Sequence, residues 1–164
     1  MVTAVSSPPV DTSKVSGRRK LKFTCCDDVL ADCERLLAGY RRLGNWSLGK
    51  MADHLAVAYK LGLDPSTIRV PWMMRFVARN VFKKKALQKM SPGFKLPKAA
   101  AQLEPNETED RAGVEKLRQI VGRWKQQPER LDHPFFGKLT PAEWDQLMLR
   151  HAEMHLSFLL PEAA

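Results

Sequence analysis

Residues 139–159, LTPAEWDQLMLRHAEMHLSFL, contain the most clearly marked helix start in the chain. Thr140 is a favourable N-cap, Pro141 suits the first helical position, and Glu143 stands where it completes a capping box with Thr140. Apolar residues then recur at steps of three and four, which is the period of a helix with one buried face. We therefore predict a helix over residues 141–159.

This predicted helix contains two histidines that share one face. His151 and His155 are four residues apart, so both imidazoles can reach a common point, as in many metal-binding helices. The pattern differs from the HExxH motif of metalloproteases, because the acidic residue between the histidines is Glu153. Glu153 follows His151 by two positions and is turned about 200° from it around the helix, so we expect it to face solvent.

A third histidine lies on another predicted helix. Ser47 is a favourable N-cap for a helix over residues 47–62, and Trp46 precedes it as part of a hydrophobic staple. His54 falls on the same apolar face as Met51, which should point into the core. Three of the four histidines in the chain therefore lie on core-directed faces of two helices.

We predict that His54, His151 and His155 hold one divalent metal ion inside a helical bundle. Three neutral nitrogens leave a coordination position for water or substrate, as in catalytic rather than structural zinc sites. Zinc is the first expectation, and nickel, iron and manganese remain open. The alternative is that these histidines are hydrogen-bonded core residues without a metal.

The remaining pattern predicts an all-α, four-helix fold with an extra helical segment. Helical periodicity extends over residues 27–43, 71–90 and 107–127, in addition to the two helices above. Either 71–90 or 107–127 is expected to lie outside the four-helix core. Residues 91–105 are rich in proline and predict a long crossover connection. We expect no strand.

Length and composition indicate one domain. Residues 1–22 lack an apolar period and predict a disordered N-terminal tail, so we assign residues 23–164 to a single domain. No run approaches the roughly 20 apolar residues of a membrane helix. The net charge of +9 would suit a polyanion, but the basic runs are not interleaved with aromatic residues, so we expect a solvated surface and at most nonspecific nucleic-acid binding.

Other polar and apolar residues are weaker candidates for the site. His133 either lines the mouth of a pocket, where it could donate a proton, or stabilises a turn. Tyr59, Met51 and Phe158 could line a pocket or support the metal ligands. No spacing singles out Asp53 or Glu34 as a base. The three cysteines, Cys25, Cys26 and Cys33, fit reduced thiols that pack in the core of a cytoplasmic protein, although a helix N-terminus could lower the pKa of Cys25 or Cys26.

Two motifs carry a resemblance to a known family. WSLG at residues 46–49 leads into the helix with His54, and HPFFGKLTPAEW at residues 133–144 leads into the helix with His151 and His155. Together they resemble the DinB/YfiT-like superfamily of metalloenzymes, in one of its branches of unknown function.

The resemblance implies a DinB-like four-helix bundle with one metal-binding His on the second helix and two on the last. His54, His151 and His155 stand at the matching positions. Members of this branch often have a further His and a Gln where this chain has Met154 and Phe158, which implies a more apolar pocket here. Characterised relatives are thiol-dependent transferases and isomerases, and their reaction comes to this chain only by analogy.

We therefore expect a metal-dependent enzyme that activates water or a low-molecular-weight thiol for transfer, isomerisation or hydrolysis of a small-molecule substrate. The alternative is a non-catalytic helical binding or structural module with a basic surface. We expect no membrane partner, and a homodimer remains open.

Overall fold

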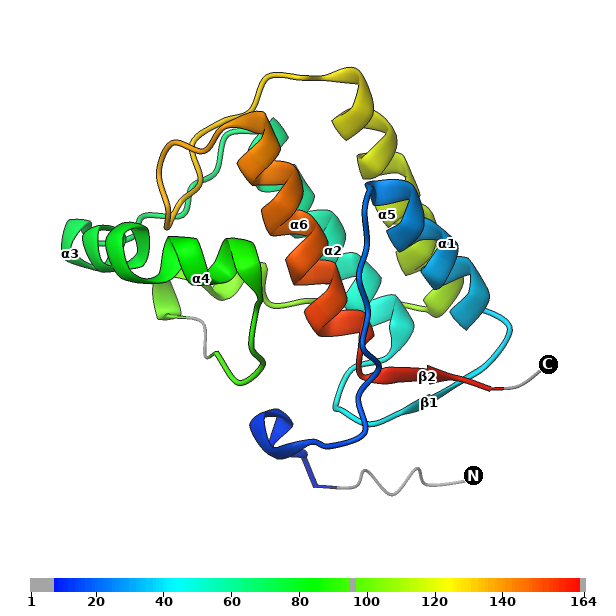
Figure 1. The fold of residues 1–164 in the computed structure, drawn as a ribbon. Helices are drawn as coiled ribbons and strands as arrows, with labels where there is room; N and C mark the ends of the chain where they lie inside the picture. Colours follow the sequence, from blue (N-terminus) through cyan, green and yellow to red (C-terminus); the bar gives the residue numbers. More distant parts are fainter. Residues whose placement is uncertain (1–7, 95–96, 163–164) are drawn as a thin grey trace.

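The computed structural model describes residues 8–94 and 97–162, and it is mostly helical (Figure 1). The four longest helices are α1 (Cys26–Leu36), α2 (Leu48–Leu63), α5 (Asp110–Gln126) and α6 (Pro141–Leu156). Helix α2 packs against both α5 and α6, and α1 contacts all three of them. The main core between them is apolar, and its largest fully buried members include Trp144, Tyr59, Leu36, Leu55, Leu117, Leu147 and Leu156.

The helix starts follow the side-chain chemistry closely. The Ser47 hydroxyl accepts the backbone N–H of Lys50, and Thr140 forms the expected capping box with Glu143. The start of α5 differs from the prediction, which placed residue 107 in the helix. The Glu109 carboxylate accepts the backbone N–H of Ala112 at 3.0 Å, so Glu109 is the N-cap and α5 begins at Asp110.

A short two-stranded sheet replaces the predicted ends of two helices. Strand β1 (Tyr40–Arg42) pairs antiparallel with β2 (Leu159–Pro161), so the predictions of helix over 27–43 and 141–159, and of no strand, are wrong at these ends. The chain leaves α1 through Gly39, whose φ of +146° favours glycine. The sheet joins residues about 120 positions apart, which local periodicity does not reveal.

Helices α2 and α5 meet backbone to backbone at two glycines. A Cβ atom added to Gly113 would lie 2.4 Å from the carbonyl oxygen of Gly49, and one added to Gly49 would lie 2.2 Å from that of Thr108. No side chain fits between the two helices at this point. The contact therefore fixes how α2, which contains His54, lies against its neighbour.

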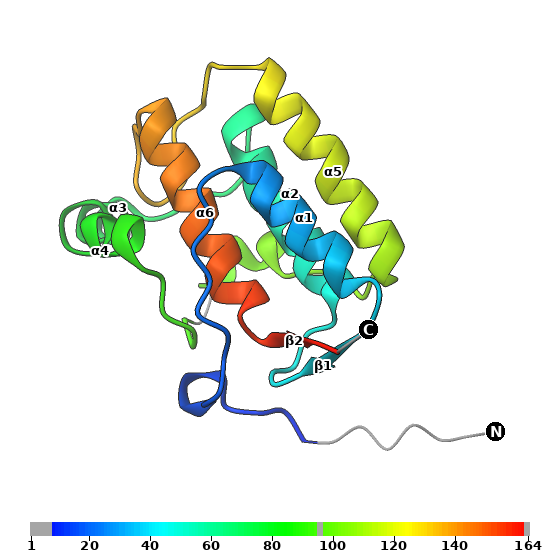
Figure 2. The same ribbon diagram turned by 45° about the vertical axis from the view of Figure 1, so that its right-hand side comes forward.

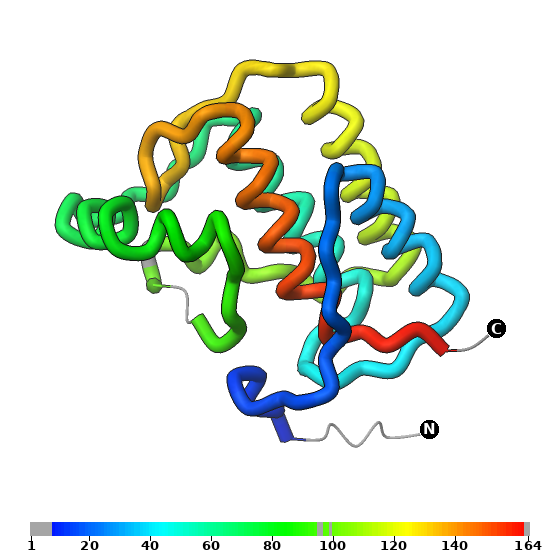
Figure 3. The backbone as a smooth tube through the Cα atoms, in the orientation of Figure 1, coloured from blue at the N-terminus to red at the C-terminus, as the bar shows by residue number. Residues whose placement is uncertain are grey.

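The segment before α1 packs on the helices instead of standing apart as a tail (Figure 3). The Arg19 guanidinium donates two hydrogen bonds to the buried carboxylate of Asp32 on α1, at 2.7 and 2.6 Å, and one to the Leu156 carbonyl at the end of α6. The expected domain start at residue 23 is therefore too late. Residues 1–7 of the predicted tail lie outside the described residues.

The same segment explains a second departure from the sequence-based expectations. Glu153 is turned away from the imidazoles as expected, but it does not face open solvent. Its carboxylate accepts the backbone N–H of Phe23 at 2.7 Å and pairs with Arg150 at 2.8 Å, and its side chain is only 15% exposed. Its role is to tie the N-terminal segment to α6.

The predicted segment over residues 71–90 is helical and peripheral (Figures 1 and 2). It consists of α3 (Trp72–Val77), a π-helical turn (Ala78–Phe82) and α4 (Lys83–Gln88), and α4 rests on α6. The following connection is not free of structure, because a 3₁₀ helix spans Lys98–Leu103. A further 3₁₀ turn, Thr12–Lys14, precedes α1. Within the described residues, every helix is too short or too polar to cross a membrane.

Candidate functional site

The three predicted histidines converge in the structure. His54 comes from α2, and His151 and His155 come from α6. The Nε2 atom of His151 lies 3.1 Å from that of His54 and 2.9 Å from that of His155. Each imidazole offers one nitrogen, and these three nitrogens all lie within 4.8 Å of one another.

The cluster sits at the boundary between the core and the surface. The His54 side chain belongs to the buried set, with 8% of the residue exposed, whereas His151 and His155 are partly exposed. The exposed side of the cluster is therefore on α6.

A backbone carbonyl fixes the orientation and tautomer of His54. Its Nδ1 atom lies 2.9 Å from the carbonyl oxygen of Leu103, a geometry in which Nδ1–H donates and the oxygen accepts. The proton is then on Nδ1, and Nε2 presents its lone pair to the other two rings. A ligand histidine that donates its second N–H to a carbonyl is the usual arrangement around metals in proteins.

The protonation states of the imidazoles also suit a ligand set. Burial lowers the pKa of His54, and burial followed by the charges of neighbouring imidazoles lowers the pKa of His151 and of His155 well below 6.5. All three rings are therefore neutral near pH 7. Neutral imidazole is the form that binds a metal ion.

The spacing of the nitrogens can be compared with the spacing around one small ion. A tetrahedral zinc ion with bonds of about 2.0–2.1 Å would separate its nitrogen ligands by about 3.3–3.4 Å. The separations of 3.1 and 2.9 Å are shorter by only a few tenths of an ångström. For the third pair, His54 and His155, the common limit of 4.8 Å applies, so ring rotations are needed to bring all three nitrogens to one ion. The donor set itself, three neutral imidazoles from two helices, fits a three-histidine metal site.

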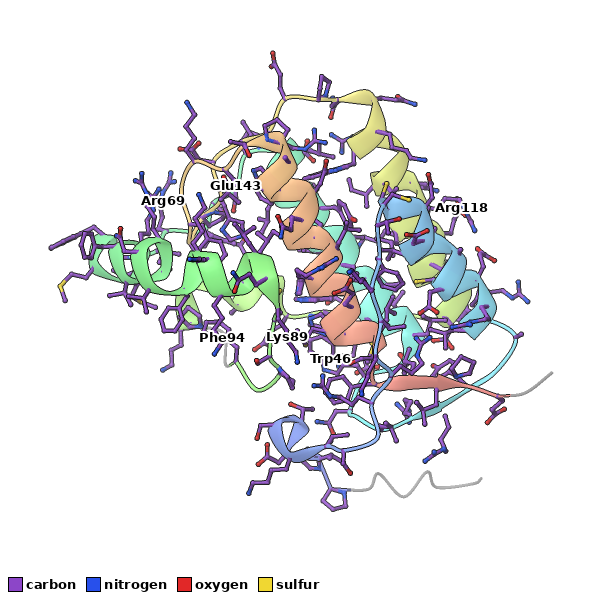
Figure 4. The ribbon with its side chains drawn as sticks, viewed as in Figure 1. Trp46, Arg69, Lys89, Phe94, Arg118 and Glu143 are labelled. Atoms are coloured by element: carbon purple, nitrogen blue, oxygen red, sulfur yellow. The ribbon has the colours of Figure 1, made fainter. Side chains whose placement is uncertain are left out.

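Trp46 is a part of the site that the sequence analysis assigned only to the start of a helix. Its indole stacks on His155, with ring centroids 5.1 Å apart and an interplanar angle of 10°, and it meets His54 edge to face at 5.2 Å. Figure 4 shows Trp46 at the C-terminal end of α6. The indole therefore supports two of the three rings, one from each helix.

His133 makes the contacts of a turn residue. Its backbone N–H and carbonyl both pair with Gly137 at 2.8 Å, and its Nδ1 accepts the N–H groups of Phe135 and Phe136. Burial lowers the pKa of His133 to about 3, so the ring is neutral near pH 7. The residue also lines a cavity of about 280 Å³ that is bordered by Arg69 and other residues but by none of the three imidazoles. These contacts support the turn-stabilising interpretation.

The other pocket candidates lie in the core. Tyr59 is buried, and its ring meets Trp124 edge to face at 5.0 Å, while burial raises the pKa of its hydroxyl. Met51 is buried one helical turn before His54. Phe158 is buried under the guanidinium of Arg18, 4.8 Å from the ring centroid. Among the ring contacts of the described residues, neither Tyr59 nor Phe158 meets an imidazole.

The polar and thiol candidates are also engaged elsewhere. The Asp53 carboxylate is buried and paired with Lys116, and the Glu34 carboxylate pairs with Arg118 at the surface. Cys33 is buried, and burial raises the pKa of its thiol to about 12. Burial also raises the pKa of Cys26, which outweighs any lowering by the helix N-terminus. Cys25, at the N-cap, is exposed and does not pack in the core as expected.

Comparison with known proteins places the chain in a family. The family described as "Protein of unknown function (DUF1569)" matches residues 15–162, and the chain belongs to it. The matched range includes the N-terminal segment with Arg19. No curated protein and no solved structure matches the chain.

Proposed function

We propose that this member of the DUF1569 family is a metal-dependent enzyme in which His54, His151 and His155 hold one divalent ion, with zinc as the first choice over nickel, iron or manganese. The observation that carries the proposal is the convergence of three neutral imidazole nitrogens, one of them oriented by the Leu103 carbonyl. Nitrogen separations of 3.1 and 2.9 Å also suit hydrogen bonds between the rings, so elemental analysis of the protein separates the metal site from hydrogen-bonded core histidines.

The bound ion would act as a Lewis acid that makes water or a thiol nucleophilic near neutral pH. The chain supplies the surroundings of that chemistry. The Leu103 carbonyl holds His54 in one tautomer, and the Trp46 indole restrains the rings of His54 and His155. His151 and His155 are the partly exposed members of the cluster, so we place the approach of a small-molecule substrate on the α6 side.

The surroundings leave both a low-molecular-weight thiol and water as the nucleophile. The two acidic residues considered as bases, Asp53 and Glu34, are paired with Lys116 and Arg118. A zinc ion lowers the pKa of its bound water to about 7, and a free thiol has a pKa of about 8.5, so neither nucleophile depends on a protein base. The reaction class is therefore transfer, isomerisation or hydrolysis, and the thiol cosubstrate comes from the resemblance.

The resemblance to the DinB/YfiT-like superfamily belongs to the same proposal. It is supported by the four long helices α1, α2, α5 and α6, and by the distribution of one histidine on α2 and two on α6. A DinB-like four-helix bundle with the segment 72–88 as its extra helix is the fold that we infer. The choice of reaction remains an analogy from fold.

Elemental analysis tests the metal site directly. We expect about one zinc ion per chain when the protein is purified or reloaded with zinc, and loss of that ion in His54→Ala and His155→Ala. His133→Asn is the matched control, because it removes a histidine outside the cluster while its side-chain oxygen can still accept the loop N–H groups. A folded parent without stoichiometric metal, or a His54→Ala protein that retains it, would refute the site.

The thiol is tested by its effect on a cobalt-loaded protein. A thiolate bound to Co²⁺ gives an intense near-ultraviolet absorption that imidazole and water ligands do not give. We expect cysteine, added to the Co²⁺ protein, to produce this absorption, and the His155→Ala protein to lack it. An unchanged spectrum at saturating cysteine would point to water instead of a thiol.

A further inference from the structure

The helical segment from Trp72 to Gln88 exposes an unusual number of large apolar side chains. Trp72 is 76% exposed and Phe76 is 63% exposed. The exposed apolar set on this segment comprises Trp72, Met73, Met74, Phe76, Val77, Val81 and Phe82. Figures 1 and 2 show the segment at the side of the molecule, beyond α6 and away from α1 and α5. An apolar surface of this kind marks an interaction site.

The same part of the chain carries its entire net charge. Residues 65–103 contain nine of the 27 Lys and Arg residues and none of the 18 Asp and Glu residues, so the rest of the chain is balanced and the net +9 lies here. Basic side chains flank the helical segment at both ends, and Figure 4 shows Arg69 and Lys89 on either side of it. Within the segment, Lys83 pairs with Glu143 of α6.

The combination of charge and apolar surface selects the partner. Nucleic acid would match the positive charge, and its bases could stack on the aromatic rings, but it offers little aliphatic surface for Met73, Val77 and Val81. A second copy of the chain would cover the apolar side chains only by bringing two segments of like charge together. An anionic lipid surface matches both the charge and the apolar side chains, because the apolar side chains enter the acyl boundary while Lys and Arg contact the headgroups.

The segment is held rigidly enough to present this surface. The Gln146 side chain donates to the Leu87 carbonyl at 2.7 Å, and Lys83 lies 2.8 Å from Glu143, so α4 is fastened to α6 by both. Ala86, Leu87 and Met90 pack on the main core. The C-terminal half of the segment is therefore anchored, and its N-terminal half projects with its apolar residues uncovered. Binding through this surface therefore costs little conformational entropy, because the segment is already held in place.

We propose that the exposed segment 72–88 docks the protein on anionic phospholipid membranes, lying in the plane of the headgroups. This surface is separate from the three imidazoles and does not depend on the metal site. It replaces the sequence-based expectation that the protein has no membrane partner. That expectation considered only spanning segments and could not foresee that these apolar residues are uncovered.

Flotation with lipid vesicles tests the proposal. We expect the full-length protein to float with vesicles of phosphatidylcholine and phosphatidylglycerol, to stay behind with phosphatidylcholine alone, and to release as salt is raised. Trp72→Ser with Phe76→Ser should abolish flotation. Arg79→Gln with Lys84→Gln and Lys85→Gln should weaken it on the order of 100-fold, because each basic residue near an anionic surface contributes about fivefold.

A matched set of charge changes provides the control. Arg41→Gln with Arg42→Gln and Lys60→Gln removes three exposed positive charges elsewhere and should leave flotation nearly unchanged. Equal losses in the two charge variants, or no flotation of the parent with anionic vesicles, would overturn the proposal. A parent dimer that dissociates in the Trp72→Ser, Phe76→Ser protein would assign the surface to a second copy, and this too would overturn it.

Discussion

The contact between Gly49 and Gly113 leads to a sharp prediction about stability. A Cβ atom on Gly113 would lie 2.4 Å from the Gly49 carbonyl oxygen and 2.8 Å from its Cα. Both neighbours are backbone atoms, so no side-chain rotation can make room, and Gly113→Ala must push α5 away from α2. Overpacking of this kind costs about 1–3 kcal/mol even when the structure relaxes.

Gly122 provides the matched control on the same helix. A Cβ atom there meets nothing within 4 Å, so Gly122→Ala gains helix propensity without a clash. Replacing glycine with alanine inside a helix stabilises by roughly 0.5–1 kcal/mol. The two alanine variants should therefore differ by about 1.5–4 kcal/mol in their free energy of unfolding, with opposite signs relative to the parent.

Urea unfolding followed by circular dichroism measures this difference. The midpoint should fall for Gly113→Ala and rise for Gly122→Ala, while the dependence on urea stays the same because the surface exposed on unfolding barely changes. A Gly113→Ala protein as stable as Gly122→Ala would show that α2 and α5 do not approach as closely as described. The position of His54 would then need revision as well.

Three further predictions concern the N-terminal segment, pH and helix capping. Arg19→Ala should lower the free energy of unfolding by about 2–4 kcal/mol, because it leaves the buried Asp32 carboxylate with only Arg35 as a partner. The Arg35 side chain is 60% exposed, so Arg35→Ala should lower it by less than about 1 kcal/mol. Equal effects in urea unfolding would contradict the packing of this segment. For pH, burial lowers the pKa of His133 to about 3, whereas the same imidazole in the unfolded chain has a pKa of about 6.5. Between these two pH values the unfolded chain binds a proton that the folded chain does not, so the free energy of unfolding falls as the pH drops. His133→Asn should make the fall shallower by up to about 1.4 kcal/mol per pH unit, and identical slopes in urea titrations at pH 7.5 and 5 would refute it. Thr140→Ala should cost about 1 kcal/mol by removing the acceptor for the Glu143 N–H, while a change at exposed Lys138 should cost little; thermal unfolding compares the two.

Features set by nearby residues could be predicted from the sequence. Ser47 and Thr140 cap their helices because the acceptor and the N–H that it binds are only three residues apart. The i, i+4 spacing brings His151 and His155 together on one helix face, and the apolar face around His54 directs it inward. The convergence of the three imidazoles could therefore be predicted from the sequence alone.

Features that depend on distant or backbone partners could not be predicted. The Leu103 carbonyl that orients His54 carries no sequence signal, since every residue has a carbonyl and only the path of the connection puts this one in place. Arg19 of the N-terminal segment pairs with Asp32 of α1, and β1 pairs with β2, which lies near the other end of the chain. The exposure of the segment 72–88 was also hidden, because an apolar period predicts a helix but does not say whether another element covers it.

His54 and His151 are 97 positions apart, so their rings meet only when α2 has docked on α6. A partly folded state that keeps its helices but has lost this docking would retain the His151–His155 pair and lose the third nitrogen. Any ligand held by all three rings therefore binds the native state alone and shifts the folding equilibrium toward it by mass action. Ligand occupancy would then report tertiary assembly and not helix content.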